Sequence, residues 1–198
     1  SSVGAKTGVD VNHVKNMVGC FAEPKAVFID VNFLATLPIL EWKSGFAEVL
    51  KHGFIGNPEL FEALCSITDI SIAPWDQLLS TSVEVKATIV RQDPFESGLR
   101  KLLNFGHTIG HALESYSLAM GEPRSHGACV AVGMVLEYHL AYQYEKVENI
   151  NIDYHKSRYG ALREVFSRFY EMPKFGAAEA VSLWELMTHD KKNAKGEV

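Results

Sequence analysis

The sequence lacks two features that would point to a nucleic acid or a membrane as its partner: a long basic run and a long apolar run. Its 19 lysines and arginines are outnumbered by 24 aspartates and glutamates, which gives a formal net charge of −5. Nucleic-acid-binding domains usually carry clustered basic residues, so no nucleic acid is expected as a partner. A membrane-spanning helix needs roughly 18 or more consecutive apolar residues, and no such stretch is present. We therefore expect no membrane partner.

Cysteine is also scarce. The three cysteines, Cys20, Cys65 and Cys129, are odd in number, scattered, and form no C-x-x-C pair. A disulfide framework or a zinc site built from cysteines is therefore not expected. The first residues are small and polar and show no signal-peptide pattern. These features predict reduced cysteines and a cytoplasmic location.

Most of the chain shows the apolar periodicity of helices. From Pro38 onward, Trp42, Phe46, Leu50 and Phe54 recur at helical spacing. Apolar residues make up 47% of the sequence, enough for a packed core. The pattern predicts a mostly α-helical fold, with helices near 38–54, 58–64, 74–90, 102–120, 126–145, 159–169 and 177–190.

The first part of the chain has a different character. Residues 1–25 are rich in glycine and are expected to form loops and turns. Lys6 and the nearby glycines could cradle a phosphate, although a plain surface loop is the simpler reading. Residues 26–30 form a short apolar run with β-branched residues, which predicts a strand. Its backbone would need a partner strand that this chain does not obviously supply.

The stretch from Asn104 to Glu114 is the most informative motif. His107 and His111 stand four residues apart, so in a helix they share one face and could bind or surround a metal. Gly106 and Gly110 each weaken a helix by about 1 kcal/mol, which suggests that something approaches the backbone closely. Thr108 replaces the glutamate that a zinc-protease motif requires. Two histidines on a solvated helix face remain the alternative reading.

Further metal ligands could come from two other helices. His126 begins a predicted helix directly after the loop that ends the His107 helix, so a helix hairpin would bring them together. Glu48 lies within an apolar run, where an unpaired carboxylate is rare. It could be a ligand, or it could simply pair with Lys51 or His52 at the surface. Imidazole and carboxylate suit zinc, but also iron, cobalt or nickel.

Several cations occur near these residues. Lys51 follows Glu48 on the same helix face. Lys86 lies in the predicted helix near 74–90, and Arg100 and Lys101 stand just before the histidine motif. Cations beside a metal would suit an anionic ligand with phosphate or carboxylate groups. Each of them alone is more often an ordinary surface charge.

Taken together, these motifs make the chain resemble the 3-dehydroquinate synthases, members of the sugar-phosphate cyclase superfamily. The Asn104–His111 segment is the most specific part of the match, and the matching segments follow the family order over almost the whole chain. They are residues 4–8, 15–16, 34–38, 46–51, 83–86, 98–111, 126–127 and 190–193.

The resemblance implies roles for individual residues. It implies a zinc ion, or alternatively cobalt, held by Glu48, His107 and His126. His111 then becomes a substrate or proton-transfer residue and not a metal ligand. The implied catalytic residues are His111, Lys51, Lys86, Arg100 and Asn104. Asn16 and one of Lys191 and Lys192 would bind substrate, and the implied NAD contacts are Lys6, Lys15, Phe33, Leu34, Ala35 and Thr36.

The family's reaction belongs to the shikimate pathway of aromatic amino acid biosynthesis. It converts 3-deoxy-arabino-heptulosonate 7-phosphate to 3-dehydroquinate and phosphate, by transient oxidation with NAD, phosphate elimination, reduction and an internal aldol closure. The family's partner is thus a small sugar phosphate, and the full-length enzyme is expected to be a homodimer.

The chain departs from the family pattern at its ends. We expect residues 1–37 to be the tail of the NAD-binding domain and residues 38–198 to be the helical metal- and substrate-binding domain. NAD would be bound mainly by the N-terminal half that is missing here. The chain is therefore expected to be a fragment without activity of its own. Ala5 and Ala128 replace a usual glycine and a common glutamate, and neither change removes a ligand.

Two other readings remain open. A related sugar-phosphate cyclase would share the metal site but form another carbocycle, and it would differ in pocket residues. A non-catalytic helical domain would use its histidines structurally, and it predicts no metal.

Overall fold

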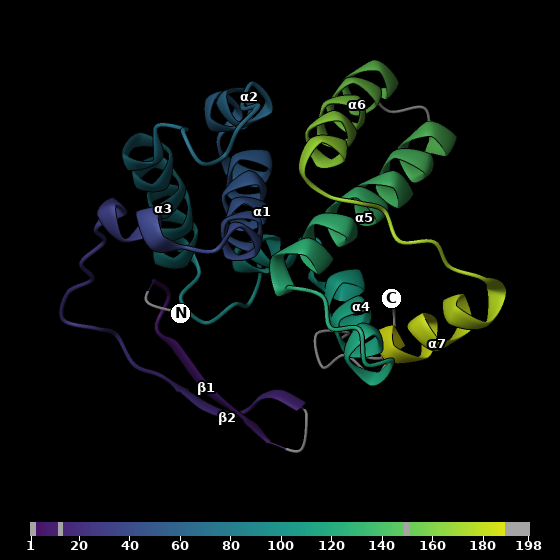
Figure 1. Cartoon of the computed structure of the whole chain (residues 1–198), viewed down its shortest axis with the longest axis horizontal. Helices are drawn as coiled ribbons and strands as arrows, with labels where there is room; N and C mark the ends of the chain where they lie inside the picture. The colour runs from purple at the N-terminus through teal and green to yellow at the C-terminus, as the bar shows by residue number, and fades with distance from the viewer. Residues whose placement is uncertain (1–2, 12–13, 149–150, 189–198) are drawn as a thin grey trace.

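The computed structural model describes residues 3–11, 14–148 and 151–188, and most of them are helical. Figure 1 shows the helices grouped together and the β-hairpin extending from them. The predicted mostly α-helical fold with a small strand-bearing N-terminal part is confirmed. None of the helices in the described ranges has the length and hydropathy needed to cross a bilayer. The elements are β1 (Lys6–Val11), β2 (Val14–Phe21), the 3₁₀ helix η1 (Val31–Thr36), α1 (Ile39–Gly56), α2 (Pro58–Cys65), α3 (Trp75–Gln92), the 3₁₀ helix η2 (Leu99–Asn104), α4 (His107–Ala119), α5 (His126–Glu148), α6 (Ile152–Phe169) and α7 (Ala177–Thr188).

The N-terminal residues form an antiparallel hairpin of β1 and β2, so the prediction of loops over residues 1–25 was wrong. Lys6 pairs with Phe21 and Val9 pairs with Val18, and the register shifts after Val9. The glycines and polar residues of both strands hide the alternating pattern that would identify a half-buried strand. Backbone pairing between the two strands therefore defines this element.

The strand predicted at residues 26–30 is also not formed. These residues have no regular structure, and Phe28 is 95% exposed. A strand exists only when its backbone groups pair with a neighbour, and the described residues offer this segment none. The segment instead leads into η1, where the Asp30 side chain accepts a hydrogen bond from the Asn32 backbone and caps the helix.

The core lies where α1, α5 and α6 meet. Phe46 and Leu50 of α1, Met134 of α5 and Leu162 of α6 are almost fully buried. Phe46 also packs edge-on against Phe169, with ring centroids 4.9 Å apart. Burying a side chain of this size contributes about 2 kcal/mol. This packing fixes α1 and α5, the two helices that carry Glu48 and His126.

The predicted helices are present, with one boundary that matters for the site. The helix expected from residue 102 begins instead at His107, because Gly106 adopts a left-handed conformation (φ +78°) that separates it from η2. A side chain at Gly133 would place its Cβ 2.0 Å from the Gly106 carbonyl oxygen. Gly106 and Gly133 therefore allow α5 to approach the start of α4 closely, next to His107.

Candidate metal centre

A cavity of about 720 Å³ collects most of the residues that the sequence singled out. The helices α1, α3, α4 and α5, the 3₁₀ helix η2 and the hairpin all contribute to its wall. A region of this size matches the volume of small-molecule sites, about 300–1,000 Å³. The predicted site residues that line it are Lys6, Glu48, Lys51, Lys86, Arg100, Asn104, His107, His111 and His126.

Three candidate metal donors meet on one side of the cavity. Glu48 Oε1 lies 3.6 Å from His107 Nε2 and 3.9 Å from His126 Nε2. Zinc bonds of 2.0–2.1 Å in a tetrahedron would place neighbouring donors about 3.4 Å apart. The observed distances are only slightly longer than this. These three atoms could therefore close on one divalent cation with little movement.

Glu48 Oε1 gives independent support for a cation at this point. The atom is buried and accepts no hydrogen bond from the described residues. A buried carboxylate oxygen without a partner is costly, unless a bound group completes its coordination. The chemistry of the surrounding donors, two imidazoles and a carboxylate, fits zinc and related divalent metals.

The second oxygen of Glu48 is held by Lys51. Lys51 Nζ donates a hydrogen bond to Glu48 Oε2 at 2.7 Å, and the residue is only 2% exposed. Burial alone would raise the pKa of Glu48, but the charges of Lys51 and His107 outweigh this and bring the pKa down to about 2. Burial also lowers the pKa of Lys51, while Glu48 opposes that shift. Glu48 is thus a carboxylate anion at neutral pH, as a metal ligand must be.

His107 is positioned at the first residue of α4 by a contact from α5. No side chain of α4 itself caps its N-terminus. Instead, Glu137 of α5 accepts hydrogen bonds from the backbone N–H of Gly106 (2.6 Å) and of Ile109 (3.1 Å). A carboxylate here satisfies free N–H groups and complements the positive end of the helix dipole. Glu137 therefore fixes the turn that carries His107.

His126 is positioned at the start of α5 by a close contact with α1. The Gly127 backbone N–H donates to Ser44 Oγ at 3.0 Å, and a Cβ at Gly127 would lie 2.1 Å from the Ser44 carbonyl oxygen. Only glycine permits this approach. Glu48 follows Ser44 by one helical turn, so the contact brings the carboxylate opposite His126.

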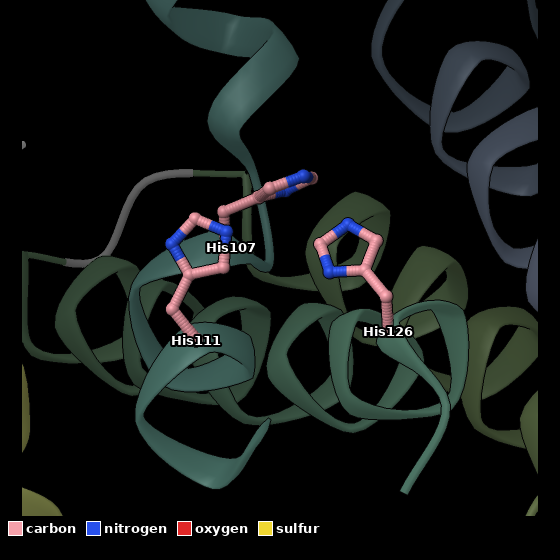
Figure 2. Close-up of side chains that lie close together, drawn as sticks. All are labelled: His107, His111 and His126. Atoms are coloured by element: carbon pink, nitrogen blue, oxygen red, sulfur yellow. The ribbon is translucent and has the colours of Figure 1, made fainter. Parts of the chain in front are cut away.

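His111 completes a cluster of three imidazoles. Figure 2 shows His107 and His111 extending from one helix and His126 from the next, with their rings gathered together. Candidate ligand atoms of the three histidines lie within 4.8 Å of one another. The geometry therefore presents four possible donors, including Glu48. The exclusion of His111 from the metal, implied by the family resemblance, stays a prediction.

Cationic side chains face the same cavity. Arg100 is 3% exposed, and its guanidinium donates to the carbonyl oxygens of Pro94 (2.6 Å) and Gly4. Asp93 accepts the backbone N–H groups of Arg100 and Gly98, which hold its pKa well below the usual range and fix the turn before η2. Burial lowers the pKa of Lys86. A partly desolvated group of cations of this kind suits an anionic ligand.

Glu96 joins two of the predicted site residues and was missed by the sequence reading. Its Oε1 accepts a hydrogen bond from Asn104 Nδ2 at 2.7 Å, and its Oε2 pairs with Lys6 Nζ. Glu96 adopts a left-handed backbone conformation (φ 60°), which a non-glycine residue rarely does. No sequence pattern signals this role, because Lys6 lies 90 residues away and Asn104 lies on the 3₁₀ helix beyond the turn that carries Glu96.

Some predicted residues do not line the cavity, and others lie outside the described part of the structure. The η1 residues Phe33–Thr36 do not line it, and Phe33 is 78% exposed. Lys15 and Asn16 lie on β2, but their side chains are outside the described part of the structure. Lys191 and Lys192 lie outside the described residues altogether. Their roles, and the NAD contacts of η1, stay predictions.

The comparisons with known proteins agree with the motifs. The model of the 3-dehydroquinate synthase C-terminal region matches residues 45–193, and that of the N-terminal region matches residues 1–44. The 3-dehydroquinate synthase of Parabacteroides distasonis is 42% identical over 99% of this chain and 54% of its own length. That of Bacillus mycoides is 39% identical over 100% of this chain and 53% of its own. The chain thus spans about half the length of these curated relatives.

Two solved structures share the fold. A 2-deoxy-scyllo-inosose synthase, complexed with carbaglucose-6-phosphate, NAD⁺ and Co²⁺, superposes with a TM-score of 0.75 at 24% identity, over 96% of this chain and 51% of that one. The 2-epi-5-epi-valiolone synthase of Streptomyces hygroscopicus subsp. jinggangensis, with NAD⁺ and Zn²⁺ bound, superposes with a TM-score of 0.69 at 25% identity, over 95% and 52%. This chain therefore shares its architecture with enzymes that bind NAD⁺ and a divalent metal.

Proposed function

Since the chain belongs to the 3-dehydroquinate synthase family, we propose that it forms the metal- and substrate-binding part of an enzyme that converts 3-deoxy-arabino-heptulosonate 7-phosphate to 3-dehydroquinate and phosphate. The observation that carries this proposal is the meeting of Glu48, His107 and His126 beside a set of buried cations. NAD would be bound mainly by the other half of the longer relatives. For this reason the 198 residues alone are proposed to lack turnover.

The metal would be held by Glu48, His107 and His126. The unpartnered Glu48 Oε1 and the short distances to both Nε2 atoms support this set. Zinc is the first candidate and cobalt the second, because the donors are nitrogen and oxygen. When bound, such an ion supplies a Lewis acid that polarises a substrate oxygen.

The cations would hold the substrate's anionic groups. Lys51, Lys86 and Arg100 line the cavity and are at least partly buried, so their interactions with phosphate or carboxylate are weakly screened. Asn104 can donate from its amide to a hydroxyl or carboxylate oxygen. In the family pattern, Asn16 and one of Lys191 and Lys192 add further contacts. The main contribution of these groups is to orient the substrate.

His111 would move a proton during the reaction. It lies one helical turn after His107 and lines the cavity, with its ring centroid 5.7 Å from that of His126. Imidazole is the side chain best suited to accept and return a proton near neutral pH. Bound NAD would supply the transient oxidation, while these residues bind and orient the substrate and carry its protons.

The activity can be tested by joining this chain to the N-terminal half of the Parabacteroides distasonis relative. The assay measures release of inorganic phosphate from 3-deoxy-arabino-heptulosonate 7-phosphate with NAD and zinc, and chromatography identifies the product. We expect release that falls at least about 100-fold in Lys86→Met. The matched control Lys101→Met removes an exposed cation one residue from Arg100 and should retain the activity.

Other results would redirect or refute the proposal. Release from a hexose 6-phosphate, but not from the seven-carbon acid, would favour a related sugar-phosphate cyclase that forms another carbocycle. A fusion that folds and binds zinc, yet releases phosphate from neither compound, would contradict catalysis and favour a structural role for the histidines.

A further inference from the structure

His126 makes a second polar contact that the proposed function does not use. Its Nδ1 lies 3.0 Å from Glu114 Oε2. Glu114 belongs to α4 and follows His107 by seven residues, or two helical turns, so both lie on the same face of that helix. The carboxylate thus reaches across from α4 to the ring of the first residue of α5.

This contact determines which nitrogen of His126 is available. A carboxylate only accepts hydrogen bonds, so the neutral imidazole must carry its proton on Nδ1 to satisfy it. The other nitrogen, Nε2, then keeps its lone pair. Nε2 is the atom that lies 3.9 Å from Glu48 Oε1, on the side of the candidate metal. The tautomer that Glu114 selects is therefore the tautomer that can bind a metal.

The two histidines of the candidate site are held differently. His107 Nδ1 lies 3.2 Å from the backbone carbonyl oxygen of Phe105, a neutral acceptor. His126 has a charged acceptor from a side chain on another helix. A carboxylate makes the imidazole a stronger base than a carbonyl does, and it adds negative charge near a divalent cation. The carboxylate partner of His126 can be removed by changing one side chain.

We propose that Glu114 is a positioning residue for the metal ligand His126: it fixes the Nδ1–H tautomer and the ring orientation and so strengthens zinc binding. This inference rests on the proposed function, since it takes the metal site as its premise. Outer partners of metal-bound histidines typically contribute about 10- to 100-fold in metal affinity. The same loss is expected when Glu114 is replaced by alanine.

The test measures zinc affinity of the 198-residue chain by competition with a chromogenic chelator. Glu114→Ala should bind zinc about 10- to 100-fold more weakly than the unaltered chain, and Glu114→Gln, which keeps an oxygen acceptor, should lose less. Glu122→Ala is the matched control, because it removes an exposed carboxylate just beyond the end of α4. Its affinity should stay within about twofold of the unaltered chain.

A second readout separates positioning from a merely structural role. Long-range ¹H–¹⁵N spectra of the metal-free chain should show His126 protonated at Nδ1, and Glu114→Ala should abolish that preference while the chain stays folded. Zinc binding that is equally tight with and without Glu114, or an Nε2–H tautomer of His126 in the unaltered chain, would overturn the inference. Failure of the unaltered chain to bind zinc would instead overturn the proposed metal site on which the inference rests.

Discussion

A buried histidine next to the site should make folding stability depend on pH. His52 of α1 is 6% exposed, and its Nδ1 lies 2.7 Å from Ser82 Oγ of α3. Its Nε2 is buried and has no hydrogen-bond partner among the described residues. Burial, and then the charge of Lys51, lower the pKa of His52 to about 4; Lys86 adds to this shift and Glu48 opposes it. The folded chain therefore holds this ring neutral.

The sign and size of the effect follow from linkage. In the unfolded chain the pKa of His52 is near its ordinary value of 6.5. Above that pH both states are neutral and the histidine has no effect. As pH falls from 6.5 toward 4, the unfolded state binds a proton that the folded state excludes, so the free energy of unfolding decreases. Between pH 7 and 4.5 this loss is about 2 kcal/mol. The Glu48 contribution is lost mostly below this range, as pH falls from its ordinary pKa of 4.5 toward its folded pKa of about 2, and it is common to the unaltered chain and His52→Gln.

The assay is urea unfolding followed by circular dichroism from pH 7 to pH 4.5, in EDTA so that no metal contributes. The unaltered chain should lose about 2 kcal/mol more than His52→Gln over this range. Thr81→Ala changes a neighbour of Ser82 without a titratable group and should keep the full pH dependence. Equal pH dependence of the unaltered chain and His52→Gln would refute the reasoning, whatever their stabilities at pH 7.

Three further substitutions test the packing that positions the site. Gly127→Ala should lower the free energy of unfolding by about 1–3 kcal/mol in urea, because its Cβ would meet the Ser44 carbonyl oxygen at 2.1 Å; an unchanged midpoint would contradict that contact. Glu137→Gln should reduce stability by about 1 kcal/mol, seen as a lower Tm, because the Gly106 N–H loses a charged acceptor; a Tm equal to that of the unaltered chain would count against the cap. Leu162→Ala, at a fully buried position, should lower stability by about 2–5 kcal/mol, and a loss below 1 kcal/mol would mean that the α6 packing is looser than described.

The helices, and the candidate donors that the structure brings together, could be picked out from the sequence because their signals are local. The four-residue spacing of His107 and His111 predicts a shared face, and the apolar surroundings of Glu48 make it a candidate ligand beside the alternative of an ion pair with Lys51 or His52. The hairpin was missed because a glycine and several polar residues in each strand interrupt the alternating apolar pattern. The strand expected at 26–30 was wrong because local composition cannot show whether a partner strand is present.

The groups that support the site could not have been predicted in this way. Glu114 contacts His126 across 12 residues, Glu137 caps Gly106 across 31, and His52 meets Ser82 across 30. Each contact exists only after the helices have packed. A carboxylate on a helix surface looks the same in sequence whether it is solvated or holds a ligand in place.

The most direct test of the account is the zinc content of the purified chain, measured by mass spectrometry after dialysis, for the unaltered chain, Glu48→Ala and His111→Ala. The account predicts close to one zinc per chain for the unaltered protein and for His111→Ala, and its loss in Glu48→Ala. Zinc retained by Glu48→Ala but lost from His111→Ala would replace the proposed ligands with the three-histidine cluster. Absence of zinc from the unaltered chain, even after zinc is added, would contradict a metal centre built by these residues.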